Sequence, residues 1–379
     1  MNDHLKFQYC VPCLFGVEGL VADELRRMNL SGVRAEDGRV FFTGSLADCA
    51  AVNLSLRCGE RVLMEIGTFP AGSFDALFEG TRALPWENIL PRDAAFPVTG
   101  YSLNSKLHSV PDCQRIIKKA VVERLKSVYG LQWLPETGET VQIRFSLMKD
   151  QASLCLDTSG EGLHKRGYRP AHNAAPLRET LAAAMVILAR YRGRGDFADP
   201  FCGSGTIPIE AALIAKNRAP GLNRRFAAMD WRVLDPGIWT RAAEQARDAE
   251  FHGEYQILGT DIDPAAVAIA RKNAARAGVE DCVRFETADA MAFDRQTERG
   301  VIVTNPPYGE RIMEKQEAEA LYAGFGRALA RCPGWQLCLL SSHTEFERCF
   351  GRQADKKRKL YNGMIKCDLF MYTDRGREK

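Results

Sequence analysis

The second half of the chain alternates between short apolar runs and longer amphipathic segments. Residues 301–304 are all β-branched and mostly apolar, which is typical of a buried strand. Residues 264–278 and 317–332 have the spacing of amphipathic helices. Strands that alternate with helices over about 200 residues predict an α/β fold with a doubly wound sheet.

The first half has a different, mixed pattern. Residues 15–30 carry apolar side chains at helical spacing, and residues 111–130 predict a second helix that opens with proline and ends at glycine. Residues 141–160 predict a strand hairpin around Lys149–Asp150. Residues 158–178, rich in glycine, proline and basic residues, predict a link between two modules. We therefore expect three units, at residues 1–60, 61–160 and 161–379.

Composition narrows the class of protein. The chain is 46% hydrophobic and 26% charged, which argues against long disorder, and its net charge is only +3. The N-terminus has no apolar signal-peptide core, and no apolar run approaches the roughly 18 residues of a membrane span. Of the twelve cysteines, only Cys10 and Cys13 have the spacing of metal ligands. The sequence has no second cysteine or histidine pair at zinc-site spacing to complete such a site. We expect reduced thiols, no metal, no membrane contact and a cytoplasmic location.

Three predicted strand ends carry residues suited to a nucleoside. In DPFCGSGT (199–206), Gly203 and Gly205 would let the backbone approach a ligand closely. In GTDID (259–263), Asp261 is placed to bind a ribose, whereas Asp263 before Pro264 fits a helix cap. Asp289 follows the third strand and would accept from an adenine amino group, unless it is only a surface turn residue.

The spacing of these motifs excludes two kinds of nucleotide site. The dinucleotide fingerprint requires a third glycine, where this chain has Pro208, and an acid about 20 residues on. Asp261 instead lies 56 residues after Gly205. No lysine follows GSGT, so the phosphate loop of nucleotide hydrolases is missing too. We expect a ligand with a ribose and an adenine but no phosphate chain.

The fourth strand ends in Asn-Pro-Pro-Tyr, residues 305–308. The Asn305 side-chain carbonyl and the Pro306 backbone carbonyl can both accept from one exocyclic amino group. Pro306 and Pro307 hold these acceptors rigidly, and Tyr308 can stack on a base. Such a site would aim an amino group at a methyl donor and work mainly by positioning. The alternative is a plain Pro-Pro turn.

Basic residues gather in two segments. Residues 106–126 hold six lysines and arginines against two acids, which could neutralise several phosphates or could be an ordinary solvated helix face. The predicted link adds Lys165, Arg166 and Arg169. The candidate RNA contacts are Lys106, Arg115, Lys118, Lys119, Lys165, Arg166 and Arg169.

DPFCGSGT, GTDID and VTNPPYGERI, in that order, resemble the class I S-adenosylmethionine-dependent methyltransferases of amino groups. More narrowly, the chain is similar to the THUMP-containing RNA guanine-N2 methyltransferases of large-subunit rRNA and their stand-alone bacterial relatives. CLFGVEGLVADEL, SKLHSVPDCQRIIKKAVVERL, LHKRGYR, PLRETLAAAMV and RKLYNGMIKCDLFMY extend the resemblance over nearly the whole chain. The second methyltransferase domain of longer members is missing, so we expect no dual activity.

The resemblance implies a ferredoxin-like subdomain and a THUMP RNA-binding domain before a Rossmann-like methyltransferase domain. It implies catalysis at Asn305, Pro306, Pro307 and Tyr308. It places S-adenosylmethionine at Asp199, Phe201, Gly203, Gly205, Thr206, Asp261, Ile262, Asp289, Ala290 and Asn305.

Several alternatives stay open. The same Asn-Pro-Pro-Tyr site would serve an adenine-N6 methyltransferase of DNA or RNA, or a protein glutamine methyltransferase. The RNA substrate can be rRNA, which the resemblance favours, or tRNA. An RNA-binding assembly factor with vestigial chemistry is the alternative outside the enzymes, and the chain can be a monomer or a homodimer.

Overall fold

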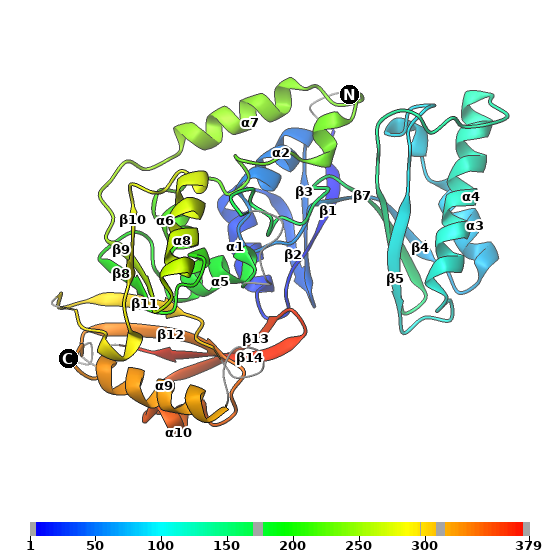
Figure 1. Cartoon of the computed structure of the whole chain (residues 1–379). Helices are drawn as coiled ribbons and strands as arrows, with labels where there is room; N and C mark the ends of the chain where they lie inside the picture. Colours follow the sequence, from blue (N-terminus) through cyan, green and yellow to red (C-terminus); the bar gives the residue numbers. More distant parts are fainter. Residues whose placement is uncertain (1–4, 170–176, 296, 308–314, 374–379) are drawn as a thin grey trace.

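The computed structural model describes residues 5–169, 177–295, 297–307 and 315–373 (Figure 1). The described part contains two seven-stranded sheets. Within these ranges, no helix is both long enough and apolar enough to cross a membrane.

The first sheet has the order β2-β3-β1-β4-β7-β6-β5 and is mostly antiparallel. Its strands are β1 (Phe7–Pro12), β2 (Ser31–Glu36), β3 (Arg39–Gly44), β4 (Leu63–Pro70), β5 (Val98–Leu103), β6 (Ile143–Met148) and β7 (Gln151–Asp157). Its helices are α1 (Glu18–Arg27), α2 (Leu46–Ser55), α3 (Phe74–Ala83) and α4 (Val110–Tyr129), with a short 3-10 turn at Trp86–Asn88.

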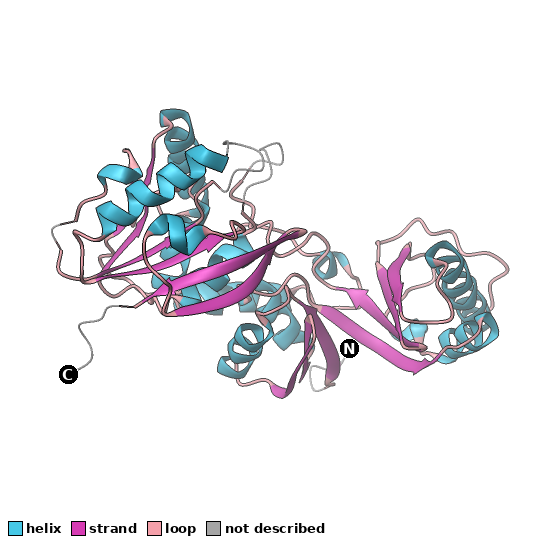
Figure 2. Cartoon of the chain, turned by 90° about the horizontal axis from the view of Figure 1, so that it is seen from below, coloured by secondary structure: helices cyan, strands magenta, loops and turns pink. Residues whose placement is uncertain are grey.

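Strands β4 and β7 connect two parts of this sheet. They pair with each other from Leu63 to Pro70, but β4 pairs with β1 only at its first two residues. Figure 1 shows the unit of α3, α4 and β5 standing to one side of the rest of the molecule, and Figure 2 shows the long strands that reach it. We call this unit, together with β6 and the connecting segments of residues 71–148, the outer lobe.

The second sheet has the order β10-β9-β8-β11-β12-β14-β13, with β8 to β12 parallel and β14 antiparallel. Its strands are β8 (Asp196–Asp199), β9 (Ile257–Asp261), β10 (Val283–Thr287), β11 (Gly300–Thr304), β12 (Trp335–Ser341), β13 (Lys356–Asn362) and β14 (Ile365–Tyr372). Its helices are α5 (Glu179–Leu188), α6 (Thr206–Ala215), α7 (Gly237–Asp248), α8 (Pro264–Ala277), α9 (Lys315–Leu329) and α10 (Phe346–Phe350), with 3-10 turns at Ala227–Asp230 and Ala290–Ala292. In Figure 1, α6 and α8 cover one face and α9 and α10 the other, which confirms the doubly wound prediction.

One hydrophobic core joins the second sheet to the first part of the N-terminal sheet. Leu54 and Leu56 belong to the same buried cluster as Ile207 and Ala211 of α6. The Gly221 amide donates to the Leu54 carbonyl at 2.8 Å. The β13–β14 hairpin docks there too, since the Arg358 Nε donates to the Gly16 carbonyl at 3.0 Å. These segments therefore form one body, which we call the main body.

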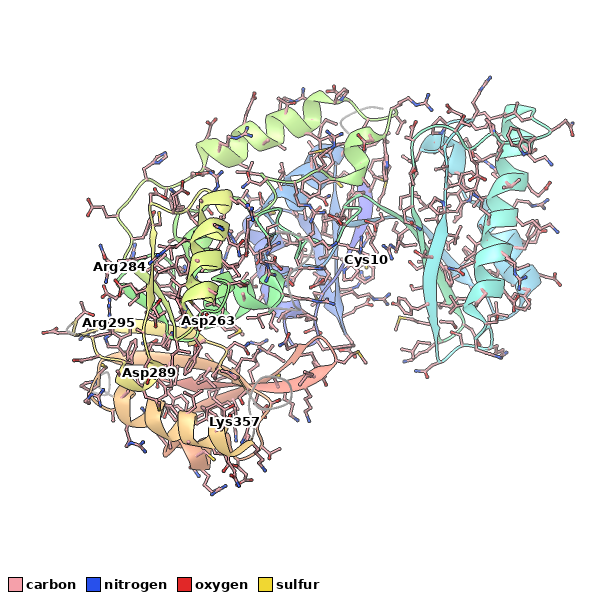
Figure 3. All side chains as sticks on the ribbon, viewed as in Figure 1. Cys10, Asp263, Arg284, Asp289, Arg295 and Lys357 are labelled. Atoms are coloured by element: carbon pink, nitrogen blue, oxygen red, sulfur yellow. The ribbon has the colours of Figure 1, made fainter. Side chains whose placement is uncertain are left out.

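The predicted helix at 111–130 is confirmed, and Gly130 ends it in the left-handed conformation with a φ of 64°. The hairpin around Lys149–Asp150 is confirmed as well, with both residues at positive φ. Strand β2 was not predicted, because its side chains are exposed or half-buried and show no apolar alternation. Both Cys10 (Figure 3) and Cys13 are buried, and burial raises the pKa of each thiol to about 12. They are therefore packed, un-ionised thiols.

Candidate active site

The strand order β9-β8-β11 brings three of the predicted strand ends to one edge of the second sheet. Asp199 ends β8, Asp261 ends β9, and Asn305 directly follows β11. Because the three strands are parallel neighbours, these residues lie side by side at their carboxyl ends. This is where an open α/β sheet binds its ligands.

The two glycines of the first turn have different roles. A Cβ at Gly205 would stand 2.9 Å from the side chains of Ala270 and Phe285, and its φ is +84°. Gly205 is therefore required by packing at the start of α6. A Cβ at Gly203, where φ is +50°, would meet no neighbour within 4 Å among the described residues. Its backbone is the one that a ligand can approach.

The Asp261 carboxylate is held by two backbone amides. Its Oδ2 accepts from the Gly203 N–H at 2.9 Å, and its Oδ1 accepts from the Asp263 N–H at 3.0 Å. The next residue, Ile262, is a large apolar side chain that is 71% exposed. Asp263 caps α8 by accepting from the Ala265 N–H at 2.8 Å, as predicted. A fixed carboxylate beside an exposed apolar surface is suited to a ribose next to a base.

Asp199 is 1% exposed and links β8 to β11. Its Oδ1 accepts from the Thr304 hydroxyl at 2.6 Å and from the Phe201 N–H at 3.1 Å. Burial raises the pKa of this carboxyl to about 7, although the two hydrogen bonds oppose the shift and Asp261 adds to it. The Asp199 carboxyl can therefore change its charge near neutral pH.

Asn305 carries an unpaired acceptor. Its side-chain Oδ1 is buried, and none of the described residues donates a hydrogen bond to it. Pro306 is buried, and the Pro307 carbonyl accepts from the Tyr322 hydroxyl at 2.8 Å. A buried acceptor left unpaired costs about 1–3 kcal/mol. Tyr308, the fourth residue of the motif, lies outside the described residues.

Four other predicted cofactor residues lie around this edge. The Asp289 carboxylate accepts from the Met291 N–H at 2.8 Å and so caps the turn in which Ala290 is buried (Figure 3). Phe201 packs edge-on against Phe325. The Thr206 hydroxyl is turned inward, because it accepts from Arg169 at 3.2 Å.

Most of the predicted RNA contacts are on the surface. Lys106, Arg115, Lys119 and Lys165 are exposed, and Lys118 is partly covered. Three of these cations already have acidic partners: Arg115 pairs with Asp112, Lys118 with Glu136 and Lys165 with Glu161. The positive charge that is available to a phosphate is therefore smaller than the sequence indicated.

The structure contradicts an RNA contact for two arginines of the predicted link. Arg166 is 2% exposed, and its guanidinium donates to the Leu163 carbonyl at 2.7 Å and faces Glu210 at 3.4 Å. The Arg169 side chain is 11% exposed and bonds to Glu179. The physical reason is that the described residues of the predicted link fold into the core of the main body.

Three possible metal ligands, Glu319, His343 and Cys349, bring their ligand atoms within 4.8 Å of one another. The His343 Nδ1 accepts from the Glu345 N–H at 3.2 Å, so the proton of a neutral ring is on Nε2. Nε2 faces Glu319 at 3.4 Å. A protonated nitrogen offers no lone pair, so the geometry fits a close His343–Glu319 contact, without a hydrogen bond between the two, better than a metal site.

Family models match three successive parts of the chain. The model of the RlmL ferredoxin-like domain matches residues 8–63, that of the THUMP domain residues 71–157, and that of the RMKL-like methyltransferase domain residues 166–370. The THUMP match covers β7 and the elements of the outer lobe.

Individual relatives agree with these models. "Putative RNA methyltransferase YpsC" of Bacillus subtilis (strain 168) is 44% identical over 98% of this chain and 97% of its own length. "Ribosomal RNA large subunit methyltransferase K/L" of Syntrophotalea carbinolica is 36% identical over 98% of this chain, which spans only 54% of that relative. The crystal structure of SMU.472 complexed with SAH is 41% identical, covers 99% of both chains and has a TM-score of 0.93. By its sequence and its architecture, this chain belongs to the RMKL-like methyltransferase family.

Proposed function

We propose that this protein transfers a methyl group from S-adenosylmethionine to the exocyclic N2 amino group of a guanine in large-subunit rRNA. The observation that carries the proposal is the buried, unpaired Asn305 Oδ1 at the end of β11. An acceptor in that position is stabilised by a ligand that donates an N–H, and the exocyclic amino group of guanine is such a donor.

The residues at the strand ends fit S-adenosylmethionine. Asp261 would bind the ribose hydroxyls, since two amides fix its carboxylate at the end of β9. Ile262 would pack on the adenine and Asp289 would accept from its amino group, while Gly203 leaves room for close backbone approach. The SAH complex of SMU.472 supports S-adenosylmethionine as the cofactor by similarity. When bound, the cofactor supplies an electrophilic methyl group.

The chain's own residues would position the nucleophile. The Asn305 Oδ1 and the Pro306 carbonyl accept from the two hydrogens of the amino group, which favours its pyramidal, nucleophilic form. Pro306 and Pro307 restrict the turn, so that these acceptors are preorganised. Tyr308 would stack on the base. Positioning rather than acid–base chemistry then provides most of the rate.

We infer that residues 1–60 form the ferredoxin-like subdomain, 61–160 the THUMP domain and 161–379 the methyltransferase domain. The outer lobe would capture the RNA through Lys106, Arg115, Lys118 and Lys119, with Lys165 as a contact on the main body. The names of YpsC and of the K/L relative support RNA as the substrate. A substrate of this kind is consistent with a cytoplasmic location.

The test is nucleoside mass spectrometry after incubation with labelled S-adenosylmethionine and, separately, undermethylated rRNA, tRNA and DNA. We expect label in N2-methylguanine of the large-subunit rRNA alone. N2-methylguanine in tRNA would change the substrate. Label in N6-methyladenine would overturn the guanine assignment.

The role of Asn305 has its own test. Asn305→Ala should lower the single-turnover rate by about 10²–10³, the usual effect of removing one preorganised polar group. If the Asn305 Oδ1 binds the substrate amino group rather than the cofactor, the variant should leave the affinity for S-adenosylmethionine within twofold; a larger loss would place Asn305 at the cofactor, as the family resemblance implies. Asn88→Ala, at an exposed position in the outer lobe, is the control. A wild-type rate for Asn305→Ala would contradict the proposal.

A further inference from the structure

The turn after β11 cannot hold itself in place with backbone hydrogen bonds from its centre. Pro306 and Pro307 have no N–H, so this stretch must be fixed through carbonyls and side chains. Among the described residues, the Tyr322 hydroxyl donates to the Pro307 carbonyl at 2.8 Å. Thr304, the residue before the turn, is held separately, because its hydroxyl donates to the Asp199 carboxylate.

Tyr322 is itself rigidly placed. It lies on α9, is 1% exposed, and packs edge-on against Phe346 with ring centroids 5.0 Å apart. Its hydroxyl is also 3.5 Å from the Ser341 Oγ at the end of β12. Ser341 is 1% exposed and accepts from the His343 N–H at 3.1 Å. The phenol therefore cannot move away from the turn without breaking buried contacts.

The His343–Glu319 pair holds the same helix face. Glu319 and Tyr322 are one turn apart on α9, so both point toward the end of β12. The His343 ring, 8% exposed, packs edge-on against Tyr322 at 5.7 Å and directs Nε2 at Glu319. Two side chains of α9 thus contact one residue that follows β12.

We propose that Tyr322 is a positioning residue for methyl transfer. Its hydroxyl fixes the Pro307 carbonyl, and through the Pro306–Pro307 turn it fixes the acceptors at Asn305 and Pro306. The inference rests on the proposed function of the Asn-Pro-Pro-Tyr motif. Tyr322 does not touch the amino group and acts only through the turn.

The test compares two tyrosine-to-phenylalanine variants. Tyr322→Phe keeps the ring contacts and removes the hydroxyl bond to Pro307. Tyr372→Phe is the matched control, because Tyr372 is 2% exposed and donates to the Arg352 carbonyl at 3.1 Å, away from the turn. Both variants should lose similar stability. Only Tyr322→Phe should lower kcat, by about tenfold, which corresponds to one hydrogen bond of about 1.4 kcal/mol.

The split between kinetic constants separates positioning from a purely structural role. We expect Tyr322→Phe to leave the KM for rRNA, the Kd for S-adenosylmethionine and the fraction of cofactor-binding protein within twofold of wild type. A kcat equal to that of Tyr372→Phe would overturn the inference. So would a loss of rate that matches a loss of cofactor-binding protein.

Asn305→Ala is measured in the same assay, so that a failure of the positioning role of Tyr322 can be told apart from a failure of the proposed function. If Asn305→Ala is inactive while Tyr322→Phe behaves like the control, the positioning role is wrong and the proposed function stands. If Asn305→Ala has the wild-type rate, the proposed function itself fails, and the inference about Tyr322 fails with it.

Discussion

Replacing Arg166 should destabilise the main body rather than weaken RNA binding. The guanidinium lies among three segments that are far apart in sequence. It faces Glu210 of α6, and it donates to carbonyls of Leu56 and Leu163. Its neighbour Lys165, by contrast, has a side chain that is 55% exposed. We therefore expect the loss of Arg166 to lower stability and the loss of Lys165 to have little effect on it.

The magnitude follows from what Arg166→Ala leaves behind. The Glu210 side chain is 0% exposed, and within the described part of the chain it keeps the Tyr168 hydroxyl as a donor at 3.3 Å. Removing one partner of a buried ion pair costs about 3–5 kcal/mol. At roughly 2–4 °C per kcal/mol for a domain of about 150–250 residues, Tm should fall by about 10 °C.

Differential scanning calorimetry measures this effect, and filter binding to rRNA at several salt concentrations measures RNA affinity. Lys165→Ala is the control and should change the free energy of unfolding by less than about 0.5 kcal/mol. If Lys165 contacts a phosphate, its loss should reduce the salt slope by about 0.9. Arg166→Ala should leave that slope unchanged at a temperature where the variant is folded.

A second substitution checks the cause. Glu210→Gln in the Arg166→Ala background removes the buried charge and should recover part of the lost stability. An unchanged Tm in Arg166→Ala, together with a smaller salt slope, would refute the buried role. That result would make Arg166 a candidate RNA contact again.

Two further predictions concern charge. The folded pKa of Asp199, about 7, lies above the ordinary aspartate value of 3.8, so its contribution to stability is full below about pH 4 and is lost as pH rises through 7. Asp199→Asn keeps an oxygen acceptor but cannot ionise. Without cofactor, the Tm of the variant minus the Tm of the wild type should therefore increase between pH 5 and pH 8. A difference in Tm that stays constant over this range would contradict the prediction. Arg232 joins the main body to Asp93 and Glu139 of the outer lobe. Arg232→Ala should therefore broaden the lobe-to-body distances measured by energy transfer, unlike Arg225→Ala, which removes only a local pair with Asp230.

The sequence allowed the candidate site to be located because the sheet topology alone determines which strand ends lie together. Parallel strands in a doubly wound sheet end at one edge, so residues at four strand ends were expected to lie together. Asp199, Asp261 and Asn305 do meet there. The helix cap at Asp263 was also predictable, since it depends only on an acid before a proline.

The supporting contacts were not predictable, because each joins segments far apart in the chain. Arg166 and Glu210 are 44 residues apart, and neither has a local signal for its partner. The one available sign was an acid within the otherwise apolar helix 206–215, which implies a buried partner. For Tyr322, an aromatic residue at a core position of a helix gave no indication that its hydroxyl reaches Pro307.

The contrast between satisfied and unsatisfied groups singles out one side chain at this edge as the expected point of substrate contact. The Asp199 and Asp261 carboxylates accept from hydroxyl or amide groups, and the Pro307 carbonyl accepts from Tyr322. Within the described part of this edge, the Asn305 Oδ1 is buried without such a donor. The described neighbours at this edge are held by their own hydrogen bonds. If an amino group binds at Asn305, as proposed, the free energy of that unpaired acceptor would be recovered, and substrate recognition would be tied to the geometry needed for methyl transfer.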